Sequence, residues 1–328
     1  MILAGDVGGT KVVLALFEDV ASRKKIKIQK FASKDFGNFG DIVKAFLPKD
    51  LKVDCACFGV AGPIQENKCH ATNLPWMIDG KEMEKSLNIS KVHLINDLEA
   101  NAWGVFALKE DEFHVLNLGV PKKGNRALIS AGTGLGEAGF YFNGKNHFPF
   151  ASEGGHADFS PDDEEEVELW RYFKNKFGHA SFERFLSGSG IENIYRFFVE
   201  NKKEIEKEEI RERMKTEDPA QVISENALQK KCPTCVKTLD RFVSIYGGEA
   251  GNLALKFLAL GGVYVGGGIA PKILEALKSG LFMRSFMDKG RFKPLLSEIQ
   301  VKVILNPETA LLGAAEFAKN SCSSIVGK

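Results

Sequence analysis

Short apolar runs alternate with amphipathic stretches along the first third of the chain. The amphipathic stretches repeat their apolar residues at helical spacing, as Phe39, Ile42, Val43 and Phe46 do. Three strands come first, as a meander, and helices and strands then alternate. This order predicts an α/β domain with a mixed sheet and not an all-parallel one. We expect strands at 2–6, 11–17, 26–31, 53–60 and 92–95, and helices at 39–47, 79–87 and 98–108.

The same arrangement of strand, glycine turn and strand starts again in the second third of the chain. Expected strands at 127–131 and 136–142 flank Gly132-Thr133-Gly134, much as the first two strands flank a turn of their own. The repeat is one of pattern and not of letters, and it predicts two related halves. Helices enlarge the second half, and we expect the first of them to have Ser160 as N-cap and Pro161 as first residue. The remaining elements are expected at 242–257 (helix), 263–265 (strand), from 271 (helix), 299–305 (strand) and 308–319 (helix).

Length and charge narrow the classes of function. A chain of 328 residues is longer than the ~250–300 residues at which single cores stop growing, so two domains are expected. The 44 basic and 43 acidic side chains give a net charge of +1, whereas a nucleic-acid-binding protein needs a basic surplus. We find no signal-peptide pattern, and no apolar run approaches the ~18 residues that span a bilayer. We therefore expect a cytoplasmic protein that binds small molecules, with no nucleic acid and no membrane as partner.

The six cysteines carry little functional signal. Cys55 and Cys57 stand two positions apart in an apolar run and are expected to face the core from one side of a strand. Cys232-Pro-Thr-Cys235 has the spacing of half a zinc site, but a structural zinc needs four ligands, and no second cysteine pair or histidine pair lies nearby. We expect the cysteines to be reduced thiols, as is usual in the cytosol.

Glycine makes up 33 of the 328 residues, and many glycines stand in turns that follow apolar strands. Three such turns are Gly5-Asp6-Val7-Gly8-Gly9-Thr10, Gly132-Thr133-Gly134 and Gly266-Gly267-Gly268. Without a Cβ atom, glycine lets main-chain N–H groups approach phosphate oxygens, and the two threonines add hydroxyl donors. Any one of these turns is equally an ordinary hairpin or a corner between strand and helix. The three together favour a nucleotide phosphate site.

Two familiar phosphate-binding motifs are excluded by spacing. A dinucleotide-binding fingerprint would need a glycine at position 137, where Glu137 stands in a segment that continues as a strand. The segment from Gly5 to Lys11 resembles a P-loop only superficially. Lys11 follows Thr10, whereas the P-loop lysine precedes the hydroxyl residue, and no helix follows.

Carboxylates at two strand ends are candidates for chemistry. Asp6 lies within the first glycine turn, where it could hold Mg²⁺, usually through water, or form an Asx turn. Asp97 follows Asn96 at the end of a later strand and precedes a helix, so catalysis and an N-cap are both open to it.

Glu153, His156 and Glu183 suit a polyol ligand. Carboxylates accept hydrogen bonds from neighbouring hydroxyls, and a ligand that lacks one hydroxyl would leave a buried acceptor unpaired. A metal role for Glu153 and His156 is less favoured, because the two glycines between them do not suit the helical geometry of zinc motifs.

Taken in order, these segments resemble the bacterial-type glucokinases. The resemblance covers essentially the whole chain, which makes it far more specific than any single turn. It rests on the glycine turn at 5–10, Ile95-Asn96-Asp97, Ala131-Gly132-Thr133-Gly134-Leu135-Gly136, Glu153-Gly154-Gly155-His156 and Gly266-Gly267-Gly268-Ile269, and extends to Ala71-Thr72-Asn73-Leu74-Pro75-Trp76, Phe182-Glu183-Arg184-Phe185-Leu186-Ser187-Gly188 and Asp288-Lys289-Gly290-Arg291-Phe292.

The resemblance implies a fold and an assembly. The superfamily of sugar kinases, actin and heat-shock chaperones has two ribonuclease-H-like, actin-like α/β domains with mixed five-stranded sheets, which close over ATP. Here the second domain would be enlarged by helical insertions. Residues 1–108 and 307–328 would form the small domain and 109–306 the large one, and a homodimer is expected.

The resemblance also implies roles for single residues. Two glycine turns would hold the ATP phosphates, with Asp6 near Mg²⁺: Gly5, Asp6, Val7, Gly8, Gly9 and Thr10 in the first, and Gly132, Thr133 and Gly134 in the second. The adenosine would be bordered by Gly266, Gly267 and Gly268. Asn96, Asp97, Glu153, His156 and Glu183 would hold glucose, with Asp97 as the general base.

Two departures qualify the resemblance. Lys11 stands where these glucokinases often carry asparagine, and lysine is more usual in the related group of repressors and sugar kinases. That second group carries a cysteine-rich zinc motif after its Gly-His, whereas Ala157-Asp158-Phe159-Ser160 follows His156 here, so the zinc-bearing group is disfavoured.

The expected activity is ATP-dependent phosphorylation of D-glucose at its 6-hydroxyl. One alternative is a kinase for another hexose, such as fructose or mannose. Another is a sugar-sensing regulator on the same fold that has lost catalysis. Polyphosphate as phosphoryl donor also stays open.

Overall fold

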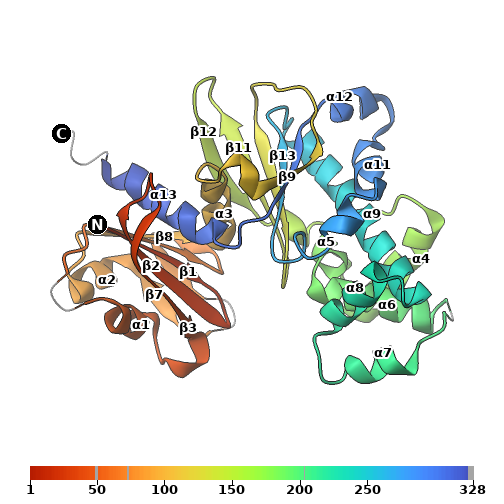
Figure 1. Ribbon diagram of the computed structural model, residues 1–328, viewed down its shortest axis with the longest axis horizontal. Helices are drawn as coiled ribbons and strands as arrows, with labels where there is room; N and C mark the ends of the chain where they lie inside the picture. Colours follow the sequence, from red (N-terminus) through yellow and green to blue (C-terminus); the bar gives the residue numbers. More distant parts are fainter. Residues whose placement is uncertain (49–50, 72–73, 203, 324–328) are drawn as a thin grey trace. The chain divides into compact units, whose positions relative to one another are not determined.

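The structure, a computed structural model, describes residues 1–48, 51–71, 74–202 and 204–323. Thr72 and Asn73, part of one motif quoted above, lie outside the described residues. Contacts within the chain divide it into two units (Figure 1). The first unit is Met1–Glu110, Pro149–Ala151 and Asn306–Lys328, and the second is Asp111–Phe148 and Ser152–Leu305.

The first unit is built on a five-stranded mixed sheet in the order β3-β2-β1-β4-β8. The meander pairs antiparallel, whereas β1, β4 and β8 run parallel, as the sequence predicted for a mixed sheet. A small antiparallel sheet, β5-β6-β7, was not predicted. The strands are β1 (Ile2–Val7), β2 (Lys11–Asp19), β3 (Lys24–Ala32), β4 (Cys55–Val60), β5 (Ile64–Gln65), β6 (Lys68–His70), β7 (Met77–Asp79) and β8 (Lys91–Asn96).

Apolar clusters cover both faces of this sheet, and β4 is therefore buried along its whole length. Ala56 and Phe58 face the cluster that contains α1, whereas Cys55 and Cys57 face the cluster that contains α13, as their spacing predicted. Figure 1 shows α13, from the end of the chain, beside strands from its beginning. The helices are α1 (Phe39–Phe46), α2 (Gly80–Leu87), α3 (Asp97–Val105) and α13 (Thr309–Ser323).

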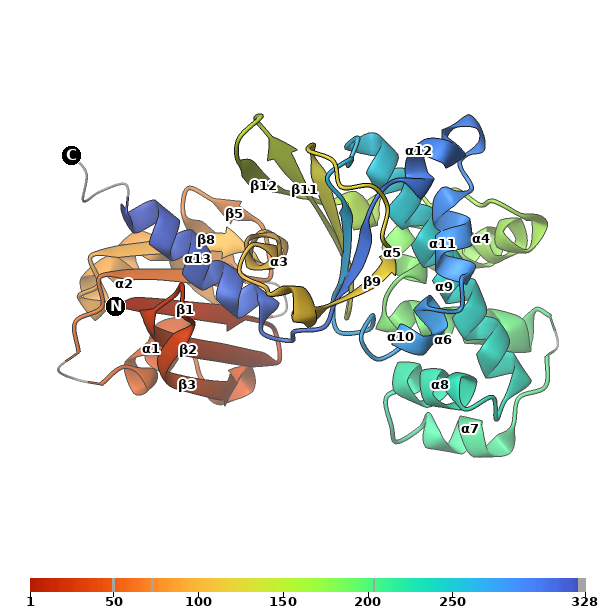
Figure 2. The same ribbon diagram turned by 45° about the horizontal axis from the view of Figure 1, so that its top comes forward.

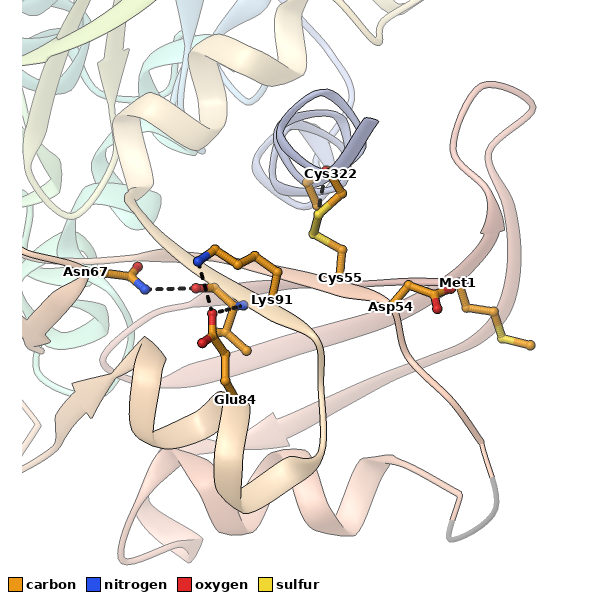
Figure 3. Close-up of a disulfide and its surroundings, with 9 residues drawn as sticks. Met1, Asp54, Cys55, Asn67, Glu84, Lys91 and Cys322 are labelled. Carbon is orange, nitrogen blue, oxygen red and sulfur yellow. Dashed lines mark hydrogen bonds and ion pairs between the residues drawn. A yellow bond between two sulfur atoms is a disulfide. The ribbon is translucent and has the colours of Figure 1, made fainter. Parts of the chain in front are cut away.

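A disulfide joins Cys55 in β4 to Cys322 near the end of α13 (Figure 3). The expectation of reduced thiols is therefore wrong for these two residues, which the fold brings together across a sequence separation of 267. The other four cysteines, Cys57, Cys69, Cys232 and Cys235, are buried free thiols.

The second unit is built on a sheet in the order β12-β11-β10-β13-β14-β9. This is one strand more than the five expected, because β9 adds antiparallel to the edge strand β14. The central strands β10, β13 and β14 run parallel, and β10 pairs antiparallel with β11, which repeats the hairpin of the first unit. The strands are β9 (Phe113–Asn117), β10 (Arg126–Ala131), β11 (Leu135–Phe142), β12 (His147–Ser152), β13 (Val263–Gly266) and β14 (Val301–Ile304).

Helices make up most of the rest of the second unit. The longest is α9 (Pro233–Lys256), which begins nine residues before the expected helix at 242–257. Helices α6, α8 and α11 pack around it (Figure 2). In the described part of the chain, no helix is long and apolar enough to cross a membrane. The other helices are α4 (Glu164–Phe177), α5 (Phe182–Phe185), α6 (Gly188–Glu200), α7 (Glu208–Arg213), α8 (Pro219–Leu228), α10 (Leu274–Leu277), α11 (Leu281–Met287) and α12 (Lys293–Ser297).

The start of α4 differs from the expectation. Its N-cap is Asp163, whose side chain accepts a hydrogen bond from the Glu166 N–H at 2.7 Å, and not Ser160. Glu166 in turn accepts from the Asp162 N–H at 2.9 Å. These reciprocal bonds satisfy main-chain donors at the helix start, which fixes it three residues later than predicted.

Candidate functional site

The carboxyl ends of three parallel strands lie at one edge of the sheet in the first unit. Val7 of β1 pairs in register with Val60 of β4, and Val60 with Asn96 of β8. The turn that carries Asp6 and the start of α3 therefore reach the same edge. This is the edge at which open α/β sheets bind their ligands.

Asn96, and not Asp97, is the N-cap of α3. Its Oδ1 accepts a hydrogen bond from the Leu98 N–H at 2.8 Å, and its Nδ2 donates to the Gly62 carbonyl at 3.2 Å. Asp97 is the first helical residue, and its Oδ1 accepts from the same N–H at 3.0 Å. A carboxylate in the first turn is also favoured by the helix dipole.

The first glycine turn is a tight hairpin between β1 and β2. The Gly8 N–H donates to the Lys11 carbonyl at 3.0 Å, and the Ser33 hydroxyl donates to the Gly8 carbonyl at 2.9 Å. Burial raises the pKa of the half-buried Asp6 carboxyl, and the charge of Lys11 opposes this. Because burial penalises its charge, a nearby divalent cation would stabilise this carboxylate, so Asp6 fits the expected role beside Mg²⁺.

The second and third glycine turns contact each other in the second unit. Ile269 N–H donates to the Ala131 carbonyl at 3.2 Å, and Gly267, at φ +83°, leaves no room for a Cβ against that same carbonyl. The buried Tyr246 of α9 supports both turns, because its hydroxyl accepts from the Ala131 N–H and contacts the Gly266 carbonyl, each at 3.2 Å. No motif or spacing pattern pointed to Tyr246.

The side chains expected to bind a polyol lie on two adjacent segments of the second unit. Glu153 precedes the 3₁₀ turn Gly154–His156 and His156 ends it. Both side chains are exposed, and their polar groups lie 3.9 Å apart. The Phe182 N–H donates to the Ala157 carbonyl at 3.1 Å, which joins this turn to the start of α5. Glu183 in α5 accepts from the Leu135 N–H at 3.0 Å and therefore contacts the second glycine turn.

The predicted site residues thus form one set in each unit. Asn96 and Asp97 share a sheet edge with the turn Gly5–Thr10. Glu183 bonds to the residue after Gly132–Gly134, and Glu153 and His156 lie on the turn that is joined to the start of α5. A buried acid beneath the 153–156 turn, Glu137, was missed as a site residue. The glycines opposite it were the only sequence signal that could have pointed to it.

Comparisons with known proteins agree on one family. The family model described as Glucokinase matches residues 3–321. A glucokinase of Nostoc punctiforme is 40% identical over an alignment of 333 residues. The alignment covers 96% of this chain and 98% of the relative. The crystal structure of a glucokinase from an Antarctic psychrotroph superposes with a TM-score of 0.84 at 29% identity, and covers 97% of this chain and 98% of its own.

A more distant solved structure has the same fold. It is a ROK family glucokinase from Streptomyces griseus in complex with glucose and AMPPNP, with a TM-score of 0.67 at 19% identity. The match covers 97% of this chain and 99% of that one.

Proposed function

The chain belongs to the glucokinase family, and we propose that it transfers the terminal phosphoryl group of ATP to the 6-hydroxyl of D-glucose. The observation that carries this proposal is a family match from residue 3 to residue 321, together with the presence, in order, of every motif on which the resemblance rests. The sheet edge that joins the turn of Asp6 to the start of α3 supports it independently.

Asp97 is the general base in this proposal. Its carboxylate accepts the proton of the 6-hydroxyl while the hydroxyl oxygen forms its bond to the terminal phosphorus, and the bond from that phosphorus to ADP breaks. Asn96 contributes by capping α3, which fixes the main chain from which Asp97 projects. A base at the end of a buried strand needs little reorganisation during the reaction.

The glycine turns hold the phosphates of ATP. Main-chain N–H groups of Gly5–Thr10 and Gly132–Gly134, other than those of Gly8 and Gly132, which bond within their own turns, stabilise the charge on the transferring group. Gly266–Gly268 borders the adenosine. Bound Mg²⁺, next to Asp6, would neutralise phosphoryl oxygens during the transfer. Lys11 supplies a positive charge beside Asp6.

The remaining acceptors select the sugar. In this proposal, the hydroxyl groups of glucose are bound by Glu153, His156, Glu183, Asn96 and Asp97. A hexose that differs at one carbon would leave one of these groups without its partner, which costs free energy. The exposed side chains of Glu153 and His156 suit a site that a ligand enters from solvent.

A coupled assay of ADP release tests the proposal. Purified protein should release ADP only when both glucose and ATP are present, and glucose should give the highest kcat/KM in a panel that includes fructose and mannose. No sugar-dependent ADP release would reject a kinase and favour a sugar sensor. Polyphosphate in place of ATP tests the donor. The homodimer and the cytoplasmic location stay predictions.

A further inference from the structure

Two acidic residues are buried in the second unit, and one of them, Glu137, contacts the turn that carries Glu153 and His156. Glu137 in β11 is 1% exposed and Glu249 in α9 is 0% exposed. The Glu249 carboxylate accepts hydrogen bonds from Lys256 Nζ at 2.9 Å and from Asn252 Nδ2 at 2.8 Å. The mechanism above uses neither acid, and a buried pair of carboxyl groups is costly unless it has a role or a shared proton.

Glu137 and Glu249 lie near enough for the charge of one to act on the other. Two buried carboxylates at this separation repel each other, and protonation of one of them removes the repulsion. Burial and then the charge of Glu249 raise the pKa of Glu137 to about 7, against the opposing charge of Lys256. Glu137 Oε1 is buried and has no hydrogen-bond partner within the described residues, which a neutral acid tolerates better than a carboxylate.

Glu137 also touches the turn directly. A Cβ atom on Gly154 would overlap the Glu137 carboxyl group, so a larger residue at this position would require that carboxyl group or the turn to move. The Ser152 hydroxyl donates to the main-chain carbonyl of Glu137 at 3.1 Å, and the Gly154 N–H donates to the Ser152 oxygen at 3.2 Å. The side chain and the main chain of Glu137 therefore both fix the segment that contains Glu153.

We propose that Glu137 is a positioning residue for glucose binding, which holds the 153–156 turn in place through its side-chain contact with Gly154 and its main-chain bond to Ser152. This role rests on the proposed function, because it matters for activity only if Glu153 and His156 bind the sugar. Helix α9 would then support the segments of the second unit that are proposed to bind ligands. Tyr246, one turn before Glu249, contacts both glycine turns of that unit.

Ionisation of Glu137 should loosen the turn. The titratable groups that face Glu137 are Glu249, Lys256 and Tyr246 of α9, and of these only Lys256 is positive at neutral pH. Ionised Glu137 would repel Glu249 in a buried site, and the repulsion would displace the side chain that contacts Gly154. Binding of glucose to an ordered turn should therefore favour the protonated form, and KM for glucose should rise with pH.

The first test compares KM for glucose between pH 6 and pH 8.5 in the wild type, Glu137→Gln and Glu275→Gln. We expect KM of the wild type to rise with pH, by about tenfold for each unit by which glucose raises the pKa of Glu137. Glu137→Gln should have a flat profile, because its amide does not ionise. Glu275→Gln removes an exposed acid paired with Lys278 and should keep the wild-type profile. Equal slopes in the wild type and Glu137→Gln would overturn the proposal.

A double-mutant cycle tests the contact without relying on pH. Gly154→Ala should raise KM for glucose more than it lowers kcat, because its methyl group displaces the turn. The same substitution should cost less in a Glu137→Ala background, where the overlapping carboxyl is gone. Additive effects would overturn direct support of the turn by Glu137. A wild-type protein without any glucose-dependent ADP release would instead reject the proposed function, which keeps the two failures distinct.

Discussion

The carboxylate of Glu183 accepts a hydrogen bond from the main-chain N–H of Leu135, with 3.0 Å between Oε2 and the nitrogen. Leu135 directly follows the glycine turn Gly132–Gly134, and a Cβ on Gly134 would overlap the same oxygen. One acidic side chain thus connects a turn proposed to hold ATP with a position proposed to hold glucose.

Substitution of Glu183 should separate these two roles. Glu183→Gln keeps an oxygen that accepts from Leu135, so it should raise KM for glucose and leave KM for ATP nearly unchanged. Glu183→Ala also leaves the Leu135 N–H unpaired, which costs about 1–3 kcal/mol, and should raise both constants by roughly tenfold or more. Steady-state kinetics with each substrate varied in turn give the answer, with Glu192→Gln on α6 as a control. Equal effects of the two variants on KM for ATP would argue against the link.

Asp97→Asn should lose turnover and keep glucose binding. Asparagine preserves the size of the side chain and an acceptor for the Leu98 N–H, but it cannot take the proton of the 6-hydroxyl. General-base catalysis contributes typically about 10²–10⁴-fold, so kcat should fall by that order.

The binding half of this prediction needs a direct measurement. Calorimetric titration with glucose should give similar affinities for the wild type and Asp97→Asn, and Glu82→Gln, an exposed acid on α2, should match the wild type in both assays. A variant that turns over at the wild-type rate would remove Asp97 from the role of base.

The strands and the sheet edge of the first unit could be predicted because their signals are local. Apolar runs at 2–6 and 11–17 that flank a glycine turn predict a hairpin, and β1 and β2 form one. Asn96 and Asp97 stand at the end of an apolar run before a helix, and they mark the strand end where the structure has it. Edge strands have weaker signals. In β12, Phe148 and Phe150 are exposed, so its apolar residues do not mark a buried face.

Features that depend on distant segments could not be predicted. In the sequence, Glu137 serves only to exclude a dinucleotide-binding fingerprint, and its importance appears when α9 places Glu249 against it. Cys55 and Cys322 gave no sign of pairing, because α13 returns to the first sheet from the far end of the chain. The N-cap of α4 was placed at Ser160 because Pro161 follows it, whereas the side-chain bonds of Asp163 and Glu166 decide the start.

Reduction of the Cys55–Cys322 disulfide should destabilise the first unit. The bond closes a loop around most of the chain, and removal of a cross-link typically costs about 2–4 kcal/mol, since the unfolded state gains freedom. Thermal unfolding should therefore occur several degrees lower in the presence of reductant. Cys322→Ser should show the lower transition with or without reductant, which separates the bond from other effects of the reagent. An unchanged transition in wild-type protein whose two additional thiols have been titrated would contradict this.

The buried acid Glu137 should also make stability depend on pH in a direction that its glutamine variant reveals. Its pKa in the folded protein is about 7, raised from an ordinary value of 4.5, so the folded state holds the proton more tightly than the unfolded state does. The stabilising contribution of that proton is complete below about pH 4.5 and is lost as the pH rises to about 7. The loss amounts to about 3 kcal/mol, from some 2.5 pKa units at 1.36 kcal/mol each.

Glu137→Gln does not ionise and should therefore gain stability relative to the wild type across this range. Urea unfolding at pH 5 and pH 8 measures the gap, which should widen with pH, whereas Glu275→Gln should follow the wild type. A gap that stays constant between the two pH values would mean that Glu137 is not protonated in the folded protein.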